Sequence, residues 1–452
     1  MSGPRIAFIG AGSVVFTRNL LGDIFDFREL REAEIALHDI DADRLATAEA
    51  IAHLTARDRG AAPRITTHAD RRTAIDGADY VINMVQIGGH AATLVDFELP
   101  ARYGLRQTIG DTLGIGGIFR ALRTADHMLA LGREMAELCP RAWLLNYTNP
   151  MSILCWLTYG GTPTSQVVGL CHSVQFTIAD LAKLVGVPKK EVTFLVAGVN
   201  HQAFVLRFAR DGEDLYPRLD ARIAADPDLQ RRIRVAVYQR FGFFPSESSE
   251  HAAEYVPWFM RRDEQLERFR IPVDEYVRRS EANLVEYEHV RRSLARGDRL
   301  RLTRSDEYAA PIIHSMETGV PRVVYGNVRN TGLVPELPED ACVEVPCRVD
   351  GTGLHPVVVR DYPPQLAALN RTFLNVVELT VRAVLEERSD FVRLAAMLDP
   401  NAAATLTLDE IDRLCDELTS AHRELLPAPL AGDPVPATTQ SHGLVGAGRG
   451  PT

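Results

Sequence analysis

The segment RIAFIGAGS at residues 5–13 decides the fold, because a run of strand-forming residues enters a glycine turn there. Residues 6–9 are all apolar, as expected of a strand that is buried on both faces of a sheet. Gly10 permits a tight turn, Gly12 lets the backbone approach a phosphate, and Ser13 leads into a helix that extends to about Phe27. Strand, glycine turn and helix in this order predict a dinucleotide-binding site.

An acidic residue follows the second predicted strand, residues 34–38. Asp39 stands where dinucleotide-binding folds place the group that bonds the ribose 2'-hydroxyl. Its carboxylate would repel a 2'-phosphate, so the sequence favours NAD over NADP. Val15 replaces the third glycine of the usual fingerprint. An ordinary glycine turn beside a surface acid is the alternative interpretation.

Strand and helix patterns alternate through the first half of the chain, which predicts a doubly wound parallel α/β sheet of the Rossmann type. Ligands of such sheets bind beyond the carboxyl ends of the strands, where Gly10, Asp39, Asn149 and Cys171 fall. The further expected elements are a helix at residues 42–57 and strands at 80–85, 143–145 and 167–170.

The pattern changes after about residue 205, and we predict a mixed α+β C-terminal domain. Expected there are helices at 227–240, 273–294 and 364–387 and strands at 323–325 and 342–345; Asp226 is the expected N-cap of the first helix. The predicted domains are residues 1–195 for NAD, residues 196–425 for substrate, metal and oligomerisation, and a disordered tail at 426–452, rich in Pro, Ala, Gly, Ser and Thr.

Composition excludes several classes of protein. The chain has 452 residues, 46% hydrophobic residues and a net charge of -10 without a lysine-rich block, so nucleic acid is not an expected partner. No run reaches the roughly 18 apolar residues of a membrane span, and the N-terminus lacks signal-peptide features. The six cysteines are scattered, which predicts no disulfide framework and a cytoplasmic location.

Two apolar runs end on side chains that can bind a metal. Cys171 follows residues 166–170, and His201 follows residues 194–199. Each residue alone could have a purely structural role, since a cysteine after a strand is usually inert and a lone histidine is usually structural. Two ligands are too few for a structural zinc site, but together with substrate oxygens they would suit a catalytic Mn2+ ion.

Two further segments carry candidate site residues. Asn149 lies in the segment NYTNP at 146–150, which is either a simple Asn-Pro turn or a reader of sugar hydroxyls at the edge of the sheet. The segment ESSEH at 247–251 is dense in acid–base groups. It is either a capped helix N-terminus or a catalytic segment, and one helix start can serve both purposes.

From about residue 6 to about residue 426 the chain resembles glycoside hydrolase family 4, the NAD- and Mn2+-dependent glycosidases that lack the usual carboxylate pair. Several motifs carry the resemblance in the same order along the chain. They are residues 8–13, 110–114, 146–151, 169–174 and 198–201, followed by 247–259, 325–328 and 363–371.

The resemblance implies a fold like that of lactate and malate dehydrogenases, and it assigns roles to individual residues. It makes Cys171 and His201 the metal ligands, and it places Asn149 and His172 with the substrate. The Cys-His-Ser-Val form at 171–174 is similar to the alpha-galactosidase subgroup, whereas subgroups acting on 6-phosphoglycosides carry other residues after the cysteine.

The resemblance leaves the catalytic base open. Some members place an Asp or Tyr base in the segment that matches residues 245–251. The candidates here are Glu247 and His251, then Glu250, with Asp111 of the 110–112 loop as a further one. Tyr255 or a metal-bound hydroxide would remain if all of these were excluded.

The implied reaction explains why a hydrolase would have a dehydrogenase fold. Oxidation of the C3 hydroxyl to a ketone transfers a hydride to NAD+ and makes the C2 proton acidic. A base removes that proton, with Mn2+ polarising the ketone, and the C1 leaving group departs by elimination. Water then adds at C1, and the hydride returns to C3, so that NAD+ is regenerated in each turnover.

We therefore expect a homo-oligomeric alpha-galactosidase, as a dimer or tetramer, with NAD and Mn2+ as cofactors. Another alpha-glycosidase, acting on a glucoside or uronide, and a dehydrogenase of the lactate/malate type are the alternatives. The dehydrogenase alternative requires an Asp-x-x-Arg segment before the histidine, and residues 193–200 contain none. A non-catalytic NAD-sensing protein is a third alternative.

Overall fold

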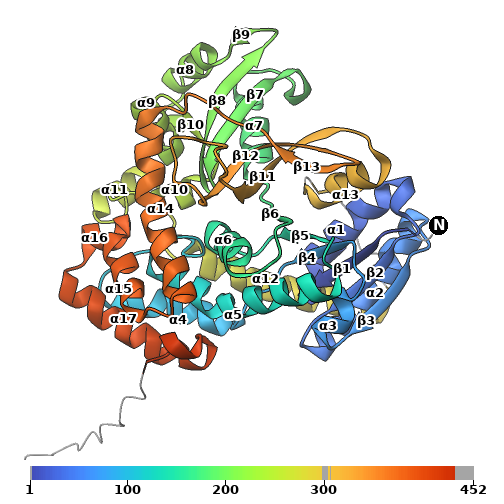
Figure 1. Ribbon diagram of the computed structural model, residues 1–452. Coiled ribbons are helices and arrows are strands. Elements are labelled where there is room, and N and C mark those ends of the chain that lie inside the picture. Colours follow the sequence, from blue (N-terminus) through green and yellow to red (C-terminus); the bar gives the residue numbers. More distant parts are fainter. Residues whose placement is uncertain (1–2, 298–303, 306, 433–452) are drawn as a thin grey trace, which may run out of the picture.

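The computed structural model describes residues 3–297, 304–305 and 307–432, and its elements are arranged around one sheet (Figure 1). Six parallel strands form the first part of this sheet, in the order β3-β2-β1-β4-β5-β6. This order is that of the doubly wound dinucleotide-binding fold, so the predicted fold class is confirmed. The strands are β1 (Arg5–Ile9), β2 (Glu34–His38), β3 (Arg64–His68), β4 (Tyr80–Asn83), β5 (Trp143–Asn146) and β6 (Val167–Gly169).

Helices connect these strands, and their ends follow local sequence chemistry. Asp41 caps α2 by accepting hydrogen bonds from the backbone N–H groups of Asp43 and Arg44, and Gly60 ends the same helix in a left-handed conformation. The helices of this half are α1 (Val14–Asp26), α2 (Ala42–Arg59), α3 (Arg71–Ile75), α4 (Gly89–Arg102), α5 (Gly114–Leu138), α6 (Met151–Gly161) and α7 (Ser173–Leu184).

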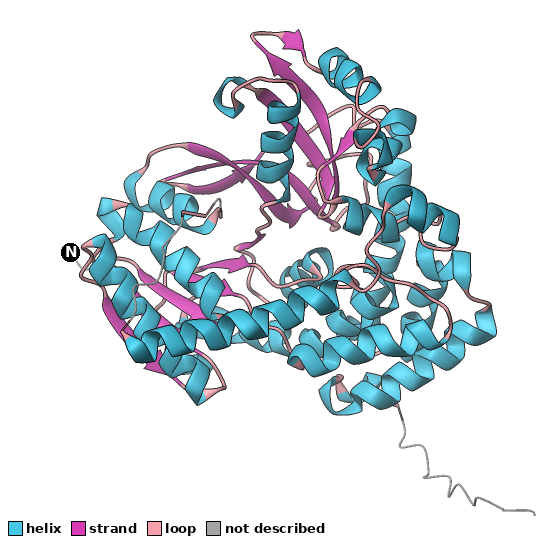
Figure 2. Cartoon of the chain, turned by 180° about the vertical axis from the view of Figure 1, so that it is seen from behind, coloured by secondary structure: helices cyan, strands magenta, loops and turns pink. Residues whose placement is uncertain are grey.

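Antiparallel strands continue the sheet beyond β6 into the second half, as Figure 2 shows from behind. Two joints consist of a single residue pair each: Asn327 of β11 faces Gly169 of β6, and Glu344 of β12 faces Gly198 of β7. The strands are β7 (Thr193–Val199), β8 (Gln202–Arg210), β9 (Glu213–Asp214), β10 (Phe244–Pro245), β11 (Arg322–Arg329), β12 (Cys342–Asp350) and β13 (Gly353–Pro356). The division into domains at residue 195 falls inside β7 and stays a prediction.

Helices pack around the strands of the second half, which therefore has the mixed α+β character that the sequence predicts. They are α8 (Tyr216–Ala224), α9 (Ile233–Phe241), α10 (Ser249–Glu254), α11 (Asp263–Phe269), α12 (Glu275–Arg296), α13 (Ala309–Thr318), α14 (Pro364–Leu385), α15 (Ser389–Leu398), α16 (Pro400–Thr405) and α17 (Leu408–His422). The helices predicted at 273–294 and 364–387 correspond to α12 and α14.

The single helix predicted at 227–240 is wrong. The chain forms a short 3-10 turn at Leu229–Arg231, passes through an extended Arg232, and only then enters α9. Asp226 does cap this region, but its carboxylate accepts from the N–H groups of Asp228 and Leu229 and so closes the short turn instead of a helix.

Three other expectations concern the cysteines, the membrane and the tail. All six cysteines are free and buried, as predicted. Within the described residues, no helix has both the length and the apolar character needed to cross a membrane. Of the predicted tail, residues 433–452 lie outside the described residues, whereas 426–432 include a 3-10 turn at Ala428–Leu430 with Leu430 buried.

Candidate functional site

The glycine turn after β1 has the tight geometry that its sequence predicts. Gly10 adopts a positive φ of 88°, and the N–H groups of Gly10 and Ala11 both donate to the carbonyl of His38. A Cβ at Gly12 would lie 2.5 Å from Asp39 Oδ2, so no larger residue fits there without displacement. The Ser13 side chain is exposed at the start of α1 and makes no capping hydrogen bond.

Asp39 is held in place at the end of β2 by backbone donors. Its Oδ2 accepts from Gly12 N at 2.7 Å, and its Oδ1 accepts from Asp41 N at 3.0 Å. Arg44 donates to the carbonyl of Gly12 at 3.1 Å. Ile40, the next residue after Asp39, is 91% exposed, which is unusual for so large an apolar side chain. The cofactor-binding residues predicted from the sequence thus lie together, with Gly10, Gly12 and Ser13 in the turn after β1 and Asp39 at the adjoining end of β2.

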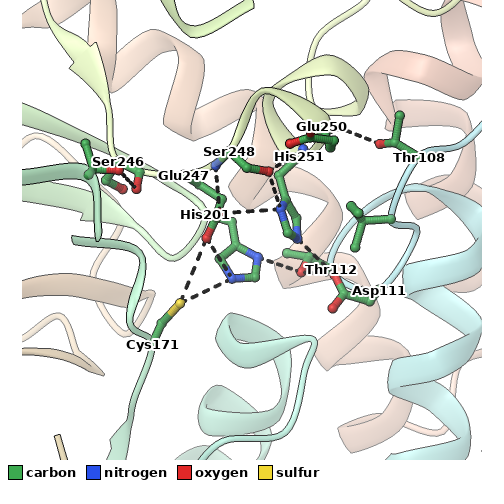
Figure 3. Close-up of polar contacts among 12 residues, drawn as sticks. Thr108, Asp111, Thr112, Cys171, His201, Ser246, Glu247, Ser248, Glu250 and His251 are labelled. Carbon is green, nitrogen blue, oxygen red and sulfur yellow. Dashed lines mark hydrogen bonds and ion pairs between the residues drawn. The ribbon is translucent and has the colours of Figure 1, made fainter. Parts of the chain in front are cut away.

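A second cluster brings together a thiol, an imidazole and a carboxylate (Figure 3). Cys171 Sγ lies 3.5 Å from His201 Nε2, and Glu247 Oε2 lies 3.5 Å from the same nitrogen and 4.0 Å from the sulfur. Cys171 follows β6, His201 occupies the turn between β7 and β8, and Glu247 precedes α10. These donor types in one buried group could hold a metal ion.

The orientation of the His201 ring is fixed from its other side. His201 Nδ1 lies 2.9 Å from Thr112 Oγ1 and 3.4 Å from the hydroxyl of Tyr255. The backbone of His201 has a φ of 67°, a left-handed conformation that is uncommon for a non-glycine residue. The ring therefore presents Nε2 to Cys171 and Glu247, as a metal ligand with a supporting partner would.

His251 lies beside this cluster, between two carboxylates. Its Nδ1 is 3.6 Å from Glu247 Oε1, and its Nε2 is 3.5 Å from Asp111 Oδ1. The Ser248 hydroxyl caps α10 by accepting from His251 N and also lies 3.2 Å from the ring nitrogen Nδ1. The helix-cap interpretation of residues 247–251 is therefore correct, and the same cap aims His251 into the site.

Burial and charge act against each other on the acids of this site. Burial alone would raise the pKa of Asp111 and of Glu247, but the neighbouring histidines, His251 above all, hold both pKa values below their usual range. Burial, reinforced by the charge of Glu247, raises the pKa of the Cys171 thiol to about 12. Burial and charge therefore shift the pKa values of these carboxyls and of the Cys171 thiol in opposite directions.

Asn149 lies at the opposite side of Asp111. Its amide Nδ2 donates to Asp111 Oδ2 at 3.0 Å, while its Oδ1 is buried and meets no hydrogen-bond donor in the part of the chain that the structure describes. Arg120 Nε donates to the Asn149 carbonyl at 3.2 Å, and Arg120 Nη1 donates to the Tyr276 hydroxyl. A buried acceptor without a donor is costly, so Asn149 Oδ1 is available to a ligand hydroxyl.

Two predicted residues lie at the margin of the site. Glu250 contacts the Thr108 hydroxyl through its main-chain carbonyl, which accepts a hydrogen bond. His172 has a side chain that is 51% exposed, and its Nδ1 lies 3.1 Å from Glu307 Oε1. Burial would lower the pKa of His172, but the hydrogen bond to Glu307 and the neighbouring negative charges raise it to about 9.

Sequence reasoning missed Glu254, which anchors the loop that carries Asp111. The buried carboxylate of Glu254 accepts from Thr108 N and Gly110 N, each at 2.8 Å, and from Ile109 N. Three backbone donors in succession thus converge on one side chain from a helix more than 140 residues later in the chain. The one sequence signal for this residue is that it lies within the motif at residues 247–259.

Glu254→Gln is expected to lower the free energy of unfolding by about 2–4 kcal/mol, because an amide NH2 would face backbone N–H donors. Differential scanning calorimetry measures the change. Glu264→Gln on exposed α11 is the matched control and should alter stability by less than about 0.5 kcal/mol. Equal stabilities of the two variants would contradict the anchoring role of Glu254.

Glu344 and Asn327 were also missed, and both lie fully buried at the joints of the sheet. Both carboxylate oxygens of Glu344 and Oδ1 of Asn327 are buried without a hydrogen-bond partner among the described residues. Burial raises the pKa of Glu344 to about 7, although the nearby His201 lowers it. The sequence offered no signal for them, because both stand inside apolar strands.

Fold and site together define a class: α/β proteins with the dinucleotide-binding strand order and a metal-competent cluster that begins at the carboxyl end of β6 in the same sheet. Solved structures agree on the fold. The lplD protein of Bacillus subtilis matches with a TM-score of 0.86 and 24% identity over 92% of this chain and 100% of its own. A Thermotoga maritima 6-phospho-beta-glucosidase with manganese, NAD+ and glucose 6-phosphate matches with a TM-score of 0.77 and 20% identity, over 93% of this chain and 99% of its own. Lactate dehydrogenase of Eimeria maxima matches with a TM-score of 0.51 and 14% identity, over 85% of this chain and 96% of its own.

Sequence comparisons specify the family. Residues 5–187 match the family 4 glycosyl hydrolase model, and residues 196–402 match the C-terminal domain of the same family. An alpha-galactosidase of Bacillus subtilis (strain 168) is 42% identical over 94% of this chain and 99% of its own length. An alpha-galactosidase of Rhizobium meliloti (strain 1021) is 33% identical over 94% of this chain and 90% of its own length. The chain belongs to family 4 of the glycosyl hydrolases, as the resemblance predicted.

Proposed function

We propose that this enzyme hydrolyses alpha-galactosides with NAD+ and a divalent cation, Mn2+, as cofactors. The observation that carries the proposal is the group Cys171, His201 and Glu247, which offers a cation site in a chain that folds as a dehydrogenase. The sugar follows from the two alpha-galactosidases that are similar over 94% of this chain. The solved relative that holds manganese and NAD+ together supports the choice of cofactors.

The turn after β1 fits a dinucleotide. A Cβ at Gly12 would clash with the side chains of Asp39 and Arg44, so only glycine lets the turn pack this closely on Asp39 before α1 begins, where a pyrophosphate would bind. Asp39, held by Gly12 N and Asp41 N, would accept from a ribose hydroxyl, and exposed Ile40 gives the adenine ring an apolar surface. When bound, NAD+ takes up and returns the hydride of sugar C3.

The donor set fits a divalent cation with open coordination positions. Thiolate and imidazole come from Cys171 and His201, and the substrate would complete the coordination with hydroxyl oxygens. The cation, when bound, polarises the oxygens on the carbons that react. Asn149 Oδ1, which is buried without a hydrogen-bond partner among the described residues, would accept from one of the same sugar hydroxyls.

We assign the removal of the C2 proton to His251. A base needs a route into the site and a group that stabilises its protonated form, and Asp111 lies 3.5 Å from His251 Nε2. Asp111 is in turn fixed by the Asn149 amide and the Thr112 hydroxyl. Asp111 then acts as a positioning residue, because the low pKa of its carboxyl makes it a weak base.

Nitrophenyl alpha-galactoside, incubated with the enzyme, NAD+, Mn2+ and a reductant, should release nitrophenol without net formation of NADH. The neutral sugar should be preferred over its 6-phosphate by at least about tenfold in kcat/KM, which corresponds to roughly 1.4 kcal/mol. Stoichiometric NADH would indicate a dehydrogenase, and preference for the phosphorylated sugar would reject the substrate assignment. The homo-oligomeric state and the cytoplasmic location remain predictions.

A further inference from the structure

We infer that Glu247 is a third protein ligand of the cation, alongside Cys171 and His201, and not the catalytic base. The inference rests on the proposed function, since it assumes that the cluster holds a divalent ion. It assigns one of the two leading base candidates to the metal and leaves His251 as the base.

The distances among the three donor atoms support a shared ion. Metal–ligand bonds of about 2.0–2.3 Å, at tetrahedral or octahedral angles, place neighbouring donors roughly 2.8–3.8 Å apart. The sulfur–nitrogen and nitrogen–oxygen distances are both 3.5 Å, and the sulfur–oxygen distance is 4.0 Å. A contraction of a few tenths of an ångström at the Cys171–Glu247 edge would therefore let one ion contact all three.

The Glu247 carboxylate is already oriented for this role (Figure 3). Its Oε1 accepts from Ser248 N at 2.7 Å, which leaves Oε2 directed at Cys171 and His201. Only 14% of the Glu247 side chain is exposed. A carboxylate that is buried and held by a backbone donor loses little entropy when it binds a cation.

Charge balance also supports Cys171, His201 and Glu247 as the three protein ligands of the cation. A thiolate at Cys171 and a carboxylate at Glu247 carry two negative charges, which equal the charge of a divalent cation. Buried charges are tolerated when they are paired or coordinate a metal. Cys171, His201 and Glu247 would together hold the cation and would leave its remaining coordination positions to oxygens of the sugar.

Glu247→Gln is the variant that isolates this role. The amide oxygen can still accept from Ser248 N, so the start of α10 keeps its hydrogen bond while the charged metal-facing oxygen is lost. We expect the dissociation constant for Mn2+, followed by electron paramagnetic resonance of free Mn2+, to rise by about 100-fold or more. The affinity for NAD+ should stay within about twofold, and Glu247→Asp should recover part of the Mn2+ affinity.

The spectrum of the Co2+-loaded enzyme gives a readout that is independent of turnover. The thiolate-to-Co2+ charge-transfer band reports Cys171, whereas the ligand-field bands report the whole ligand set. Glu247→Gln should shift the ligand-field bands and keep the charge-transfer band. Unchanged ligand-field bands would contradict the inference.

Two controls separate the failure of this inference from failure of the proposed function. Glu250→Gln makes the same chemical change three residues later and should leave the Mn2+ affinity unchanged. His251→Gln should do so as well; loss of metal binding in this variant would favour instead the alternative group of Asp111, His201 and His251. Absence of metal binding by the unmodified enzyme would refute the proposed function, whereas equal binding by the enzyme and by Glu247→Gln would refute only the inference.

Discussion

Cys171→Ser and His201→Ala are each expected to lower kcat/KM for an alpha-galactoside by about 1000-fold or more, which is roughly 4 kcal/mol of transition-state stabilisation. The reason is that Cys171 Sγ and His201 Nε2 lie 3.5 Å apart in one buried cluster, so that either change removes a donor atom from the cation site. The nucleotide turn at Gly10 and Gly12 contributes none of these atoms. The affinity for NAD+ should therefore change by less than about threefold, or 0.7 kcal/mol.

Steady-state kinetics and a fluorescence titration with NADH measure the two effects. The assay buffer is treated with a chelator and then supplied with defined Mn2+, because trace metal would obscure a loss of affinity. Wild-type turnover of either variant at low Mn2+ would show that the cluster is not the cation site. Parallel loss of NADH binding would show that the substitution disturbs the fold.

The second large effect concerns the proton on C2. The unmodified enzyme should exchange deuterium at C2 of a labelled galactoside with solvent, and His251→Ala should reduce the exchange rate by about 100- to 10,000-fold. The imidazole of His251 lies between Asp111 and Glu247, with Nε2 3.5 Å from Asp111 Oδ1 and Nδ1 3.6 Å from Glu247 Oε1. Nuclear magnetic resonance of the recovered sugar measures the exchange.

Each outcome of the exchange experiment identifies a different base. If His251→Ala exchanges normally and Glu247→Gln does not, the two roles assigned above are reversed. If both variants exchange normally, the hydroxyl of Tyr255, 3.4 Å from His201 Nδ1, becomes the leading candidate. Hydrolysis by the unmodified enzyme with neither exchange nor an isotope effect would indicate ordinary acid hydrolysis.

Local sequence signals predicted the parts of the site that depend on local structure. The turn at Gly10, the cap by Ser248 and the placement of Cys171 after a strand each follow from a few consecutive residues. The polar strand β3, Arg64–His68, was missed because it has no continuous apolar run. The interruption at Arg232 was missed because the helical pattern continues on both sides of it.

Long-range contacts could not be predicted from one sequence. Glu254 meets the N–H groups of residues 108–110 only because α10 packs on that loop. Glu344 reaches the site because β12 enters the sheet between β11 and β7. The direction of Glu247 toward Cys171 and His201 likewise depends on a hydrogen bond from Ser248 N and on the fold around it.

The order of the strands has a consequence for how the enzyme is made in the cell. β6 and β7 precede Cys171 and His201, yet the strands that join them, β11 and β12, end only at residues 329 and 350. We expect the six parallel strands to fold first during synthesis, with the outer edge of β6 uncovered. The ribosome must therefore complete about three quarters of the polypeptide before the strands that hold Cys171 and His201 in one sheet are all present. Premature termination would release a nucleotide-binding fragment whose β6 edge is uncovered and prone to aggregation.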